Sequence, residues 1–329
     1  AGAALAAMPP AATGTRTRPF LKIQDGCNSF CTYCIVPYAR GRSRSLSPAG
    51  VLEHMRQLGG MGYREVVLTG IHLGAYGLDL SPPTHLLALL EAIEAEQPVA
   101  RVRLSSIEPN ELTEDMIDLV ASSDMFCPHF HLPLQSADDA ILKRMHRPYS
   151  RDLFRQQVAA IKRRLPHAAV GADILVGFPG ETQEAFAHTA GLLAELPLSY
   201  LHVFPFSPRP GTPAADYPDQ IPPEVIKKRT AEIRAVGADK KAAFMGRAVG
   251  RRETVLVETR RDASTGLLKG MTGNYLVVLV EGGDHHMNTI LPVQLDTVHD
   301  AGRLIGKIAV PEPMNTDKSV SARAAGGVE

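Results

Sequence analysis

The sequence is poor in cysteine, has no net charge, and lacks both a secretory signal and any long apolar run. Thirty-five basic residues balance thirty-five acidic ones over 329 residues, so the overall charge predicts neither a nucleic-acid-binding protein nor a membrane-surface protein. The longest apolar stretches are of strand length and are broken by charges, which excludes a helix that spans a bilayer about 30 Å thick. We therefore expect a soluble, cytoplasmic protein that does not associate with membranes.

Four cysteines are too few for a disulfide scaffold in a chain of this size. Cys27, Cys31 and Cys34 lie within eight residues, and such clustering indicates metal binding. Thiolates at this CxxxCxxC spacing can ligate three irons of a 4Fe–4S cluster, whereas a structural cluster or a zinc site usually has four ligands. The alternative is a zinc knuckle completed by a distant histidine or by Cys127. We otherwise expect Cys127 to be a buried structural thiol.

Short β-rich runs alternate with helical stretches from about residue 18 to residue 245, which is the pattern of parallel β/α units. Ser47 and Thr113 are among the predicted helix start signals. Right-handed crossovers would curl the strands into a partial (β/α)6 barrel, with the active face at their carboxyl ends. The six strands are predicted at residues 21–24, 65–70, 102–106, 129–134, 172–177 and 200–206.

The pattern changes near residues 246–250, where ETVLVE, NYLVVLV, TILPVQL and LIGKI alternate in polarity between Gly, Asp and Asn turns. These four strands predict a small, OB-like antiparallel barrel. The predicted organisation is a disordered lead-in (1–15), an α/β core (16–246), a small all-β barrel (247–310) and a disordered tail (311–329).

Polar residues and glycines stand where predicted strands end. In ADILVGFPGET, Gly177 lets the backbone approach a ligand closely, whereas the helix dipole would favour Glu181 near a helix start whatever its function. Gln135 and Ser136 follow HFHLPL and are able to hydrogen-bond a cofactor. A helix N-cap is nevertheless the simpler interpretation of Ser136 taken alone.

Two more segments add candidates with open interpretations. Thr69 and Gly70 end a strand before the glycine-rich loop IHLGAYG. His72 in that loop is either an ordinary loop histidine, which we favour, or a substrate contact. Arg144 and Arg147 either pair with a carboxylate or phosphate or lie on a solvated helix face, which is the commoner fate of such residues.

The neutral chain contains a basic carboxyl-terminal third. Between Lys227 and Lys269, basic residues outnumber acidic ones by about two to one. Lysine and arginine neutralise phosphates, and small β-barrels commonly bind nucleic acid. This distribution favours RNA binding, with a solvated helix and barrel surface as the alternative.

With these motifs in place, residues 16 to about 308 resemble the radical S-adenosylmethionine (radical SAM) methylthiotransferases that modify tRNA. The resemblance rests on RTRPFLKIQDGCNSFCTYCIVPYARGRSRS, LTGIHLGAYG, RLSSIEP, CPHFHLPLQS, LVGFPGET and LHVFPFSPRPGTPAA. It is closest to the branch that acts on N6-threonylcarbamoyladenosine beside the anticodon, and the sister branches differ most in the loop IHLGAYG. The terminal barrel is similar to the RNA-binding TRAM domain of these enzymes.

The resemblance implies the cofactors and their ligands. Cys27, Cys31 and Cys34 would hold a 4Fe–4S cluster whose open iron binds S-adenosylmethionine. The residues implied to contact S-adenosylmethionine are Tyr33, Thr69, Gly70, Ser106, Gln135, Ser136, Gly177 and Glu181.

The resemblance also implies a reaction in which a 5′-deoxyadenosyl radical activates C2 of the adenine and a methylated sulfur is inserted. The expected partners are the anticodon stem-loop of tRNA and an electron donor such as a flavodoxin or ferredoxin, with the protein a monomer. The family's second 4Fe–4S cluster needs three further cysteines, which this sequence does not contain, so we expect a fragment that lacks the first domain.

Three other functions stay open at this point. The first two are methylthiotransferases that act on isopentenyladenosine in tRNA or on an aspartate of a ribosomal protein. The third is a non-catalytic RNA-binding remnant whose cluster is only structural.

Overall fold

Six parallel strands form the core of the protein, as the sequence predicts. The computed structural model describes residues 16–309, and the predicted disordered segments 1–15 and 311–329 lie outside the described residues. The strands form two sheets in the orders β1-β4-β5 and β6-β7-β8, joined by one parallel bridge between Val102 and Phe126. Their bounds are β1 (Phe20–Lys22), β4 (Glu65–Thr69), β5 (Arg101–Leu104), β6 (His129–Gln135), β7 (Ala169–Val176) and β8 (Tyr200–Pro205).

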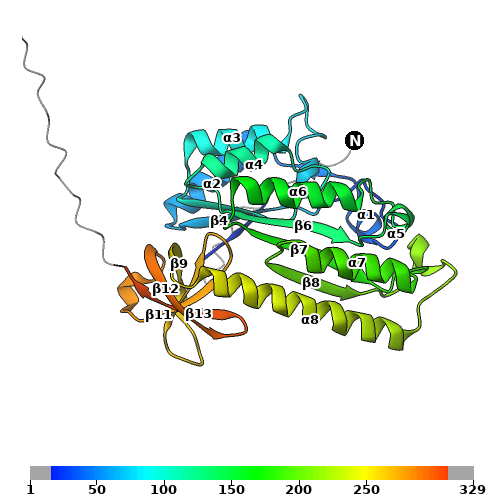
Figure 1. Cartoon of the computed structure of the whole chain (residues 1–329). Helices are drawn as coiled ribbons and strands as arrows, with labels where there is room; N and C mark the ends of the chain where they lie inside the picture. Colours follow the sequence, from blue (N-terminus) through cyan, green and yellow to red (C-terminus); the bar gives the residue numbers. More distant parts are fainter. Residues whose placement is uncertain (1–15, 310–329) are drawn as a thin grey trace, which may run out of the picture.

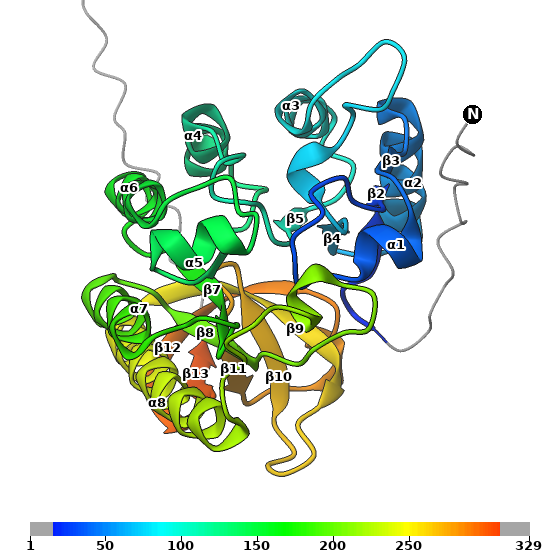
Figure 2. The ribbon, with the colours of Figure 1, turned by 90° about the vertical axis from the view of Figure 1, so that its right-hand side faces the viewer.

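Helices cover the outside of these strands in an arc (Figure 2). Ser47 accepts a hydrogen bond from the amide of Gly50 at the start of α2, and Thr113 accepts one from Met116 at the start of α4, so both predicted start signals are confirmed. The helices are α1 (Val36–Arg40), α2 (Pro48–Gly60), α3 (Leu86–Glu96), α4 (Glu114–Ser122), α5 (Asp139–Arg144), α6 (Arg151–Arg164), α7 (Gln183–Glu195) and α8 (Pro223–Ala248).

Alternation along the strands separates an apolar face from a polar one. Val66 and Leu68 of β4 belong to the main hydrophobic core together with Val102 of β5. Residues between them on each strand point to the other side of the sheet, because successive side chains alternate. This opposite face, which lines the interior of the arc, carries charged and imidazole side chains such as Arg103 and His131.

The small barrel differs from the predicted one in two respects. It closes in the order β10-β11-β13-β12-β9, and β11 pairs with β13 in parallel, so the prediction of a wholly antiparallel barrel is wrong at that pair. It also contains a strand, β10, that the sequence did not predict. Gly270 interrupts the apolar pattern of β10. The position requires glycine, because a Cβ there would lie 2.4 Å from Val255 Cγ1. The strands are β9 (Arg252–Arg261), β10 (Leu268–Thr272), β11 (Val277–Val280), β12 (Ile290–Asp300) and β13 (Arg303–Ile308).

The small barrel lies at the end of the core opposite α1 and α5, and α8 runs along the core to reach it (Figure 1). We call the end with α1 and α5, where the parallel strands finish, the mouth, and the end that faces the small barrel the floor. Within residues 16–309, no helix is both long and apolar enough to cross a membrane.

Three buried charged residues, Glu65, Arg101 and Arg103, tie the floor to the small barrel. Glu65 accepts hydrogen bonds from Arg101 Nε at 2.7 Å and Arg103 Nε at 2.9 Å. The arginines also donate to carbonyl oxygens of the small barrel, Arg101 to Met271 at 2.9 Å and Arg103 to Gly273 at 2.8 Å. Burial disfavours the Glu65 carboxylate, but the two guanidinium groups outweigh it and lower the pKa of Glu65. We call these three residues the floor clamp.

Candidate active site

The cysteine triad lies at the mouth, on the loop between β2 (Gln24–Asp25) and α1. Cys31 is buried and Cys27 and Cys34 are half-buried. The Cys27 amide donates to the carbonyl of Gly41 at 3.1 Å and the Cys34 amide to that of Cys31 at 2.9 Å, so the loop holds the cysteines through its own backbone. This is the loop position that the sequence predicts, because chemistry in such barrels gathers where the strands end.

The three cysteine sulfur atoms are not gathered as closely as three ligands of a single zinc ion. Across residues 16–309, the only group of three His, Cys or acidic ligand atoms within 4.8 Å of one another lies elsewhere, at His131, Asp173 and His202. Zinc–sulfur bonds of about 2.3 Å in a tetrahedral site would place three thiolates within about 4 Å of one another. Three thiolates around a larger 4Fe–4S cubane are necessarily farther apart. The donor set therefore fits that cluster, and the sulfur positions do not favour a single zinc ion.

Gln24 organises this loop, although no motif singles it out in the sequence. Its side chain is fully buried, and Nε2 donates to the carbonyl of Gly26 at 2.8 Å and to Ser43 Oγ at 2.9 Å. Its Oε1 accepts from the amide of His72 at 2.8 Å. Gln24 thus connects both ends of the cysteine loop with the loop after β4. The only feature of the sequence that pointed to Gln24 was its place as a polar residue at the end of the short strand LKIQ.

His72 contacts a cluster cysteine, which neither of its predicted interpretations included. Its Nδ1 lies 3.6 Å from Cys27 Sγ, and its Nε2 lies 2.7 Å from Glu111 Oε1. Burial opposes the charged imidazole, but the contacts with Cys27 and Glu111 prevail and raise the pKa of His72 to about 10. A positive charge beside Cys27 stabilises its thiolate, which is the form that binds iron.

Arg147 plays the same part for Cys31. Its Nη1 donates to Cys31 Sγ at 3.2 Å, its Nη2 pairs with Glu108, and its Nε donates to Tyr149 Oη at 2.8 Å. The side chain is only 6% exposed. The carboxylate-pair interpretation is therefore confirmed for Arg147, and the solvated-face interpretation is wrong. Arg144 lies over the ring of Tyr217 and forms a longer pair, at 3.9 Å, with the exposed carboxylate of Asp219.

Tyr33 and the turn after β7 meet on one side of the triad. The Tyr33 ring packs edge-on against Phe178 with ring centres 6.4 Å apart. Gly177 adopts a φ of 81°, and a Cβ there would lie 2.4 Å from Ile226, so the turn requires glycine for packing as well.

Glu181 is buried in contacts within the protein. Its Oε2 accepts from the Gly177 amide at 2.9 Å and from Arg229 Nη1 of α8 at 2.8 Å. Burial raises the pKa of the Glu181 carboxyl although Arg229 opposes the shift. These contacts connect the turn to α8. They account for a buried carboxylate at this position without any bound ligand. The contact of Glu181 with S-adenosylmethionine stays a prediction.

The remaining predicted contacts lie at the ends of β4, β5 and β6. Gly70 packs so closely that a Cβ would lie 2.9 Å from Gln24 Oε1, and the Thr69 carbonyl accepts from the Ile23 amide at 2.9 Å. Both therefore adjoin the cysteine loop. Ser106 follows β5 and lines a cavity of about 430 Å³ that extends to the small barrel. Their roles as cofactor contacts stay predictions.

Gln135 and Ser136 end β6 differently from each other. Gln135 is half-buried with a φ of 64°, in the left-handed region that non-glycine residues rarely adopt. Ser136 is buried against Thr189, and its Oγ accepts from the amide of Asp138. The N-cap interpretation of Ser136 is wrong, because Asp138 caps α5 by accepting from two amides. The carboxylate of Asp138 reaches both amides, which the buried hydroxyl does not.

Cys127 is buried at the floor beside the floor clamp, as predicted for a structural thiol. Burial raises its pKa to about 11, although the positive charges of Arg103 and Arg101 oppose the shift. An inert, protonated thiol at this place does not complete a metal site at the mouth.

Comparison with known proteins agrees with this geometry. A model of the Radical SAM superfamily matches residues 21–193. The threonylcarbamoyladenosine tRNA methylthiotransferase MtaB of Bacillus subtilis is 38% identical over 282 residues, which are 85% of this chain and 62% of that protein. A tRNA-2-methylthio-N(6)-dimethylallyladenosine synthase of Pelotomaculum thermopropionicum is 38% identical over 276 residues, 84% of this chain and 62% of that protein. The chain thus spans less than two thirds of the length of these relatives.

Solved structures share the fold at low identity. Coproporphyrinogen III oxidase (HemN) from Escherichia coli aligns with a TM-score of 0.51 and 12% identity, over 88% of this chain and 68% of its own. The radical S-adenosylmethionine methyltransferase TsrM from Kitasatospora setae aligns with a TM-score of 0.51 and 20% identity, over 60% of this chain and 38% of its own. The superfamily model covers more than half of the 329 residues and includes the cysteine loop, so the chain belongs to the Radical SAM superfamily.

Proposed function

We propose that this chain supplies the radical-forming core and the RNA-binding, TRAM-like barrel of a tRNA methylthiotransferase. The proposed reaction adds a methylthio group to C2 of N6-threonylcarbamoyladenosine next to the anticodon. Support comes from the relatives named MtaB in Bacillus subtilis and Rickettsia prowazekii, which are 38% and 40% identical. The dimethylallyladenosine synthase of Pelotomaculum matches at 38%, so identity does not separate the two substrates, and the loop IHLGAYG favours the first.

One observation carries the proposal: three cysteines on one loop at the mouth, with a guanidinium on Cys31 and an imidazole on Cys27. A 4Fe–4S cluster bound there would supply one electron to S-adenosylmethionine, and that cofactor would supply a 5′-deoxyadenosyl radical able to remove hydrogen from unactivated carbon. Cys27, Cys31 and Cys34 hold the iron. Arg147 and His72 offset the negative charge of the thiolates, and Gln24 keeps the loop in place.

The resemblance to tRNA methylthiotransferases implies a second cluster with three more cysteine ligands. Cys127 is the one cysteine of this sequence outside the triad, and it is buried at the floor. We therefore propose that these 329 residues start the radical reaction, while the thiols that complete sulfur transfer are not among them.

The proposed tRNA contact uses the basic third of the chain. Lys227, Lys228 and Arg234 of α8 and Arg252 and Arg260 of β9 are exposed. Exposed cations of this kind neutralise phosphates and make binding salt-dependent. We expect tRNA affinity to fall steeply as salt rises.

The decisive experiment is anaerobic reconstitution with iron and sulfide, followed by dithionite reduction and chromatographic assay of 5′-deoxyadenosine. Wild type is expected to bind iron and cleave S-adenosylmethionine, and Cys31→Ala to lose both. Cys127→Ala is the matched control, because it removes a buried thiol far from the mouth and should keep both. Undiminished cleavage in Cys31→Ala would refute the proposal, as would no cleavage in reconstituted wild type.

The substrate is tested separately with synthetic anticodon stem-loops. We expect the stem-loop that carries N6-threonylcarbamoyladenosine to bind more tightly and to stimulate cofactor cleavage more than the isopentenylated or unmodified ones. Stronger stimulation by the isopentenylated stem-loop would reassign the substrate to the sister branch. Binding of RNA without any cofactor cleavage would favour the non-catalytic remnant.

A further inference from the structure

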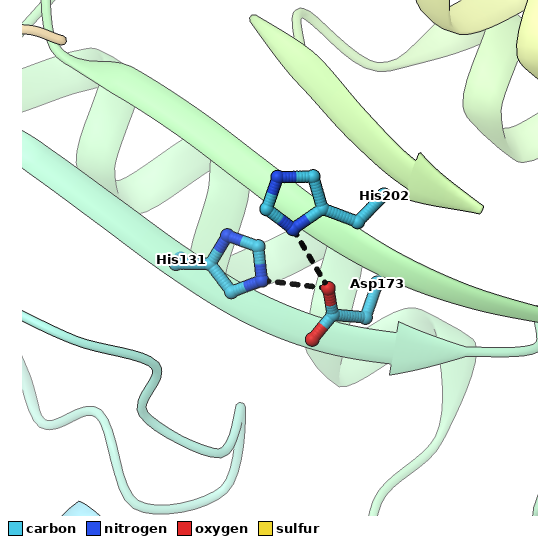
Figure 3. A group of neighbouring side chains, drawn as sticks. All are labelled: His131, Asp173 and His202. Atoms are coloured by element: carbon cyan, nitrogen blue, oxygen red, sulfur yellow. Dashed lines mark ion pairs between the residues drawn. The ribbon is translucent and has the colours of Figure 1, made fainter. Parts of the chain in front are cut away.

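Three potential metal ligands, His131, Asp173 and His202, point toward one another from adjacent strands (Figure 3). Asp173 of β7 lies directly opposite His202 of β8. His131 of β6 lies opposite Gly171, two residues before Asp173 and therefore on the same face of the sheet. The strand register thus brings two imidazoles and one carboxylate together from residues that are distant in the sequence. None of them belongs to the cysteine site.

The ligand atoms converge at distances that suit one metal ion. His131 Nε2 lies 2.9 Å and His202 Nδ1 lies 3.3 Å from the same carboxylate oxygen, Asp173 Oδ1. All three atoms lie within 4.8 Å of one another. Bonds of about 2.0–2.2 Å from one ion to nitrogen and oxygen ligands place neighbouring ligand atoms about 2.8–3.1 Å apart in an octahedral site and about 3.3–3.6 Å apart in a tetrahedral site. The observed separations of 2.9 Å and 3.3 Å lie within these limits.

A second layer of contacts holds His131 in position. Its Nδ1 lies 2.9 Å from the hydroxyl of Tyr200, which also lies 2.8 Å from His129 Nε2. Tyr200 has room for its ring only because residue 171 is glycine, since a Cβ there would lie 2.1 Å from the ring carbon Cζ. A metal-binding histidine typically has its other ring nitrogen fixed by such a partner, which sets the tautomer and the ring orientation.

The group is accessible from a cavity. His131 and His202 line the 430 Å³ cavity between the core and the small barrel, and the side chain of His202 is 52% exposed.

We propose that His131, Asp173 and His202 bind one divalent first-row transition-metal ion whose remaining coordination positions face the cavity. Two imidazoles and one carboxylate are the ligand set that zinc and non-haem iron(II) use when positions must stay open to other ligands. The competing account is a hydrogen-bonded triad that binds no metal. His188 and Asp138 show that simpler case, a histidine and a carboxylate 2.9 Å apart without a third ligand.

The test is equilibrium dialysis of the cluster-reconstituted chain against buffered Zn²⁺, with iron and zinc measured in the same samples. The reconstituted form is used because iron then occupies the thiols. We expect about one zinc per chain beyond the iron. Asp173→Asn and His202→Ala should each weaken binding at least tenfold, and Tyr200→Phe by about tenfold, since partners of metal ligands contribute about 10–100-fold to affinity.

His188→Ala is the matched control and should bind zinc as wild type does. His202→Ala keeps the test valid if Asp173→Asn misfolds, because His202 is exposed. Zinc binding that is absent in wild type, or unchanged in His202→Ala at constant iron content, would overturn the proposal in favour of the hydrogen-bonded triad. Neither result depends on radical activity, so failure here is distinguishable from failure of the proposed function.

Discussion

The two ends of the core treat charged and metal-binding groups in opposite ways. At the floor, the carboxylate of Glu65 forms ion pairs with Arg101 and Arg103. Both arginines also donate hydrogen bonds to carbonyl oxygens of the small barrel. At the mouth, the thiols of Cys31 and Cys27 contact a guanidinium and an imidazole, and we propose that all three thiols bind a group from outside the protein. The floor charges therefore hold two parts of the chain together, and the mouth charges prepare a site.

The difference teaches how to separate structural from functional residues in this protein. A buried ion pair satisfied entirely by protein partners contributes to stability, and removing one partner leaves a costly unpaired charge. A guanidinium that reaches a cysteine sulfur instead affects what that sulfur binds. Substitutions at the floor should thus act on unfolding, and substitutions at the mouth on iron content and turnover.

The largest expected effect comes from Glu65→Gln in the floor clamp. It leaves two buried arginines without a counter-charge and should lower the free energy of unfolding by about 3–5 kcal/mol. Urea unfolding followed by circular dichroism measures it. Glu53→Gln is the control, because Glu53 pairs with Arg56 on the exposed surface and should cost less than about 1 kcal/mol. Equal losses of unfolding free energy in both variants would contradict the proposal that the floor clamp stabilises the protein.

A smaller loss of stability is expected from Gly171→Ala. The added Cβ would meet the Tyr200 ring at 2.1 Å, and forcing this contact should cost about 1–3 kcal/mol. Gly191→Ala serves as the control, since nothing lies within 4 Å of a Cβ at that position of α7. Alanine should stabilise the helix there by about 0.5–1 kcal/mol. Thermal unfolding of both variants would show shifts of opposite sign, and shifts of the same sign would contradict the close packing seen at Gly171.

At the mouth, Arg147→Lys should lower cofactor cleavage about tenfold, or about 1.4 kcal/mol in activation free energy. Lysine keeps the charge but cannot contact Cys31, Glu108 and Tyr149 together through a planar fork. Iron content and 5′-deoxyadenosine formation are measured on the same reconstituted samples. Arg144→Lys, at the last residue of α5 and without a sulfur contact in the described structure, should retain both values. A large fall in the free energy of unfolding with unchanged cofactor cleavage would show that Arg147 acts on stability and not on the cysteine site.

The smallest expected effect concerns pH and Asp138, which caps α5 near the mouth. Burial disfavours its carboxylate, but His188 and two amides of α5 outweigh it and lower the pKa of Asp138. A carboxyl whose pKa is lowered by folding contributes stability above its unfolded pKa of about 3.9 and loses it as pH falls through the folded value. The advantage of wild type over Asp138→Asn should be under about 1 kcal/mol at pH 6 and should shrink as the pH falls below about 4. An advantage that grows on acidification would contradict this sign.

The local sequence pattern was sufficient to predict much of the secondary structure. The six core strands were predictable because each alternates or is continuously apolar over four to eight residues and is followed by a turn. Ser47 and Thr113 were recognisable as helix caps because each stands before an apolar helix. Strand β10 was not predictable, because Lys269 and Gly270 interrupt its alternation. Ser136 was misassigned because the residue that caps α5 stands two positions later.

The sequence by itself determined the cysteine spacing, the order of the strands and the place of the loops, because these depend on neighbours in the chain. Only the tertiary structure decided that Arg147 reaches Cys31, that Arg101 and Arg103 meet the small barrel, and that Asp173 receives His131 and His202. Such contacts join residues that are tens to more than a hundred positions apart. They depend on strand register and on which elements pack together, and alternation within one strand specifies neither.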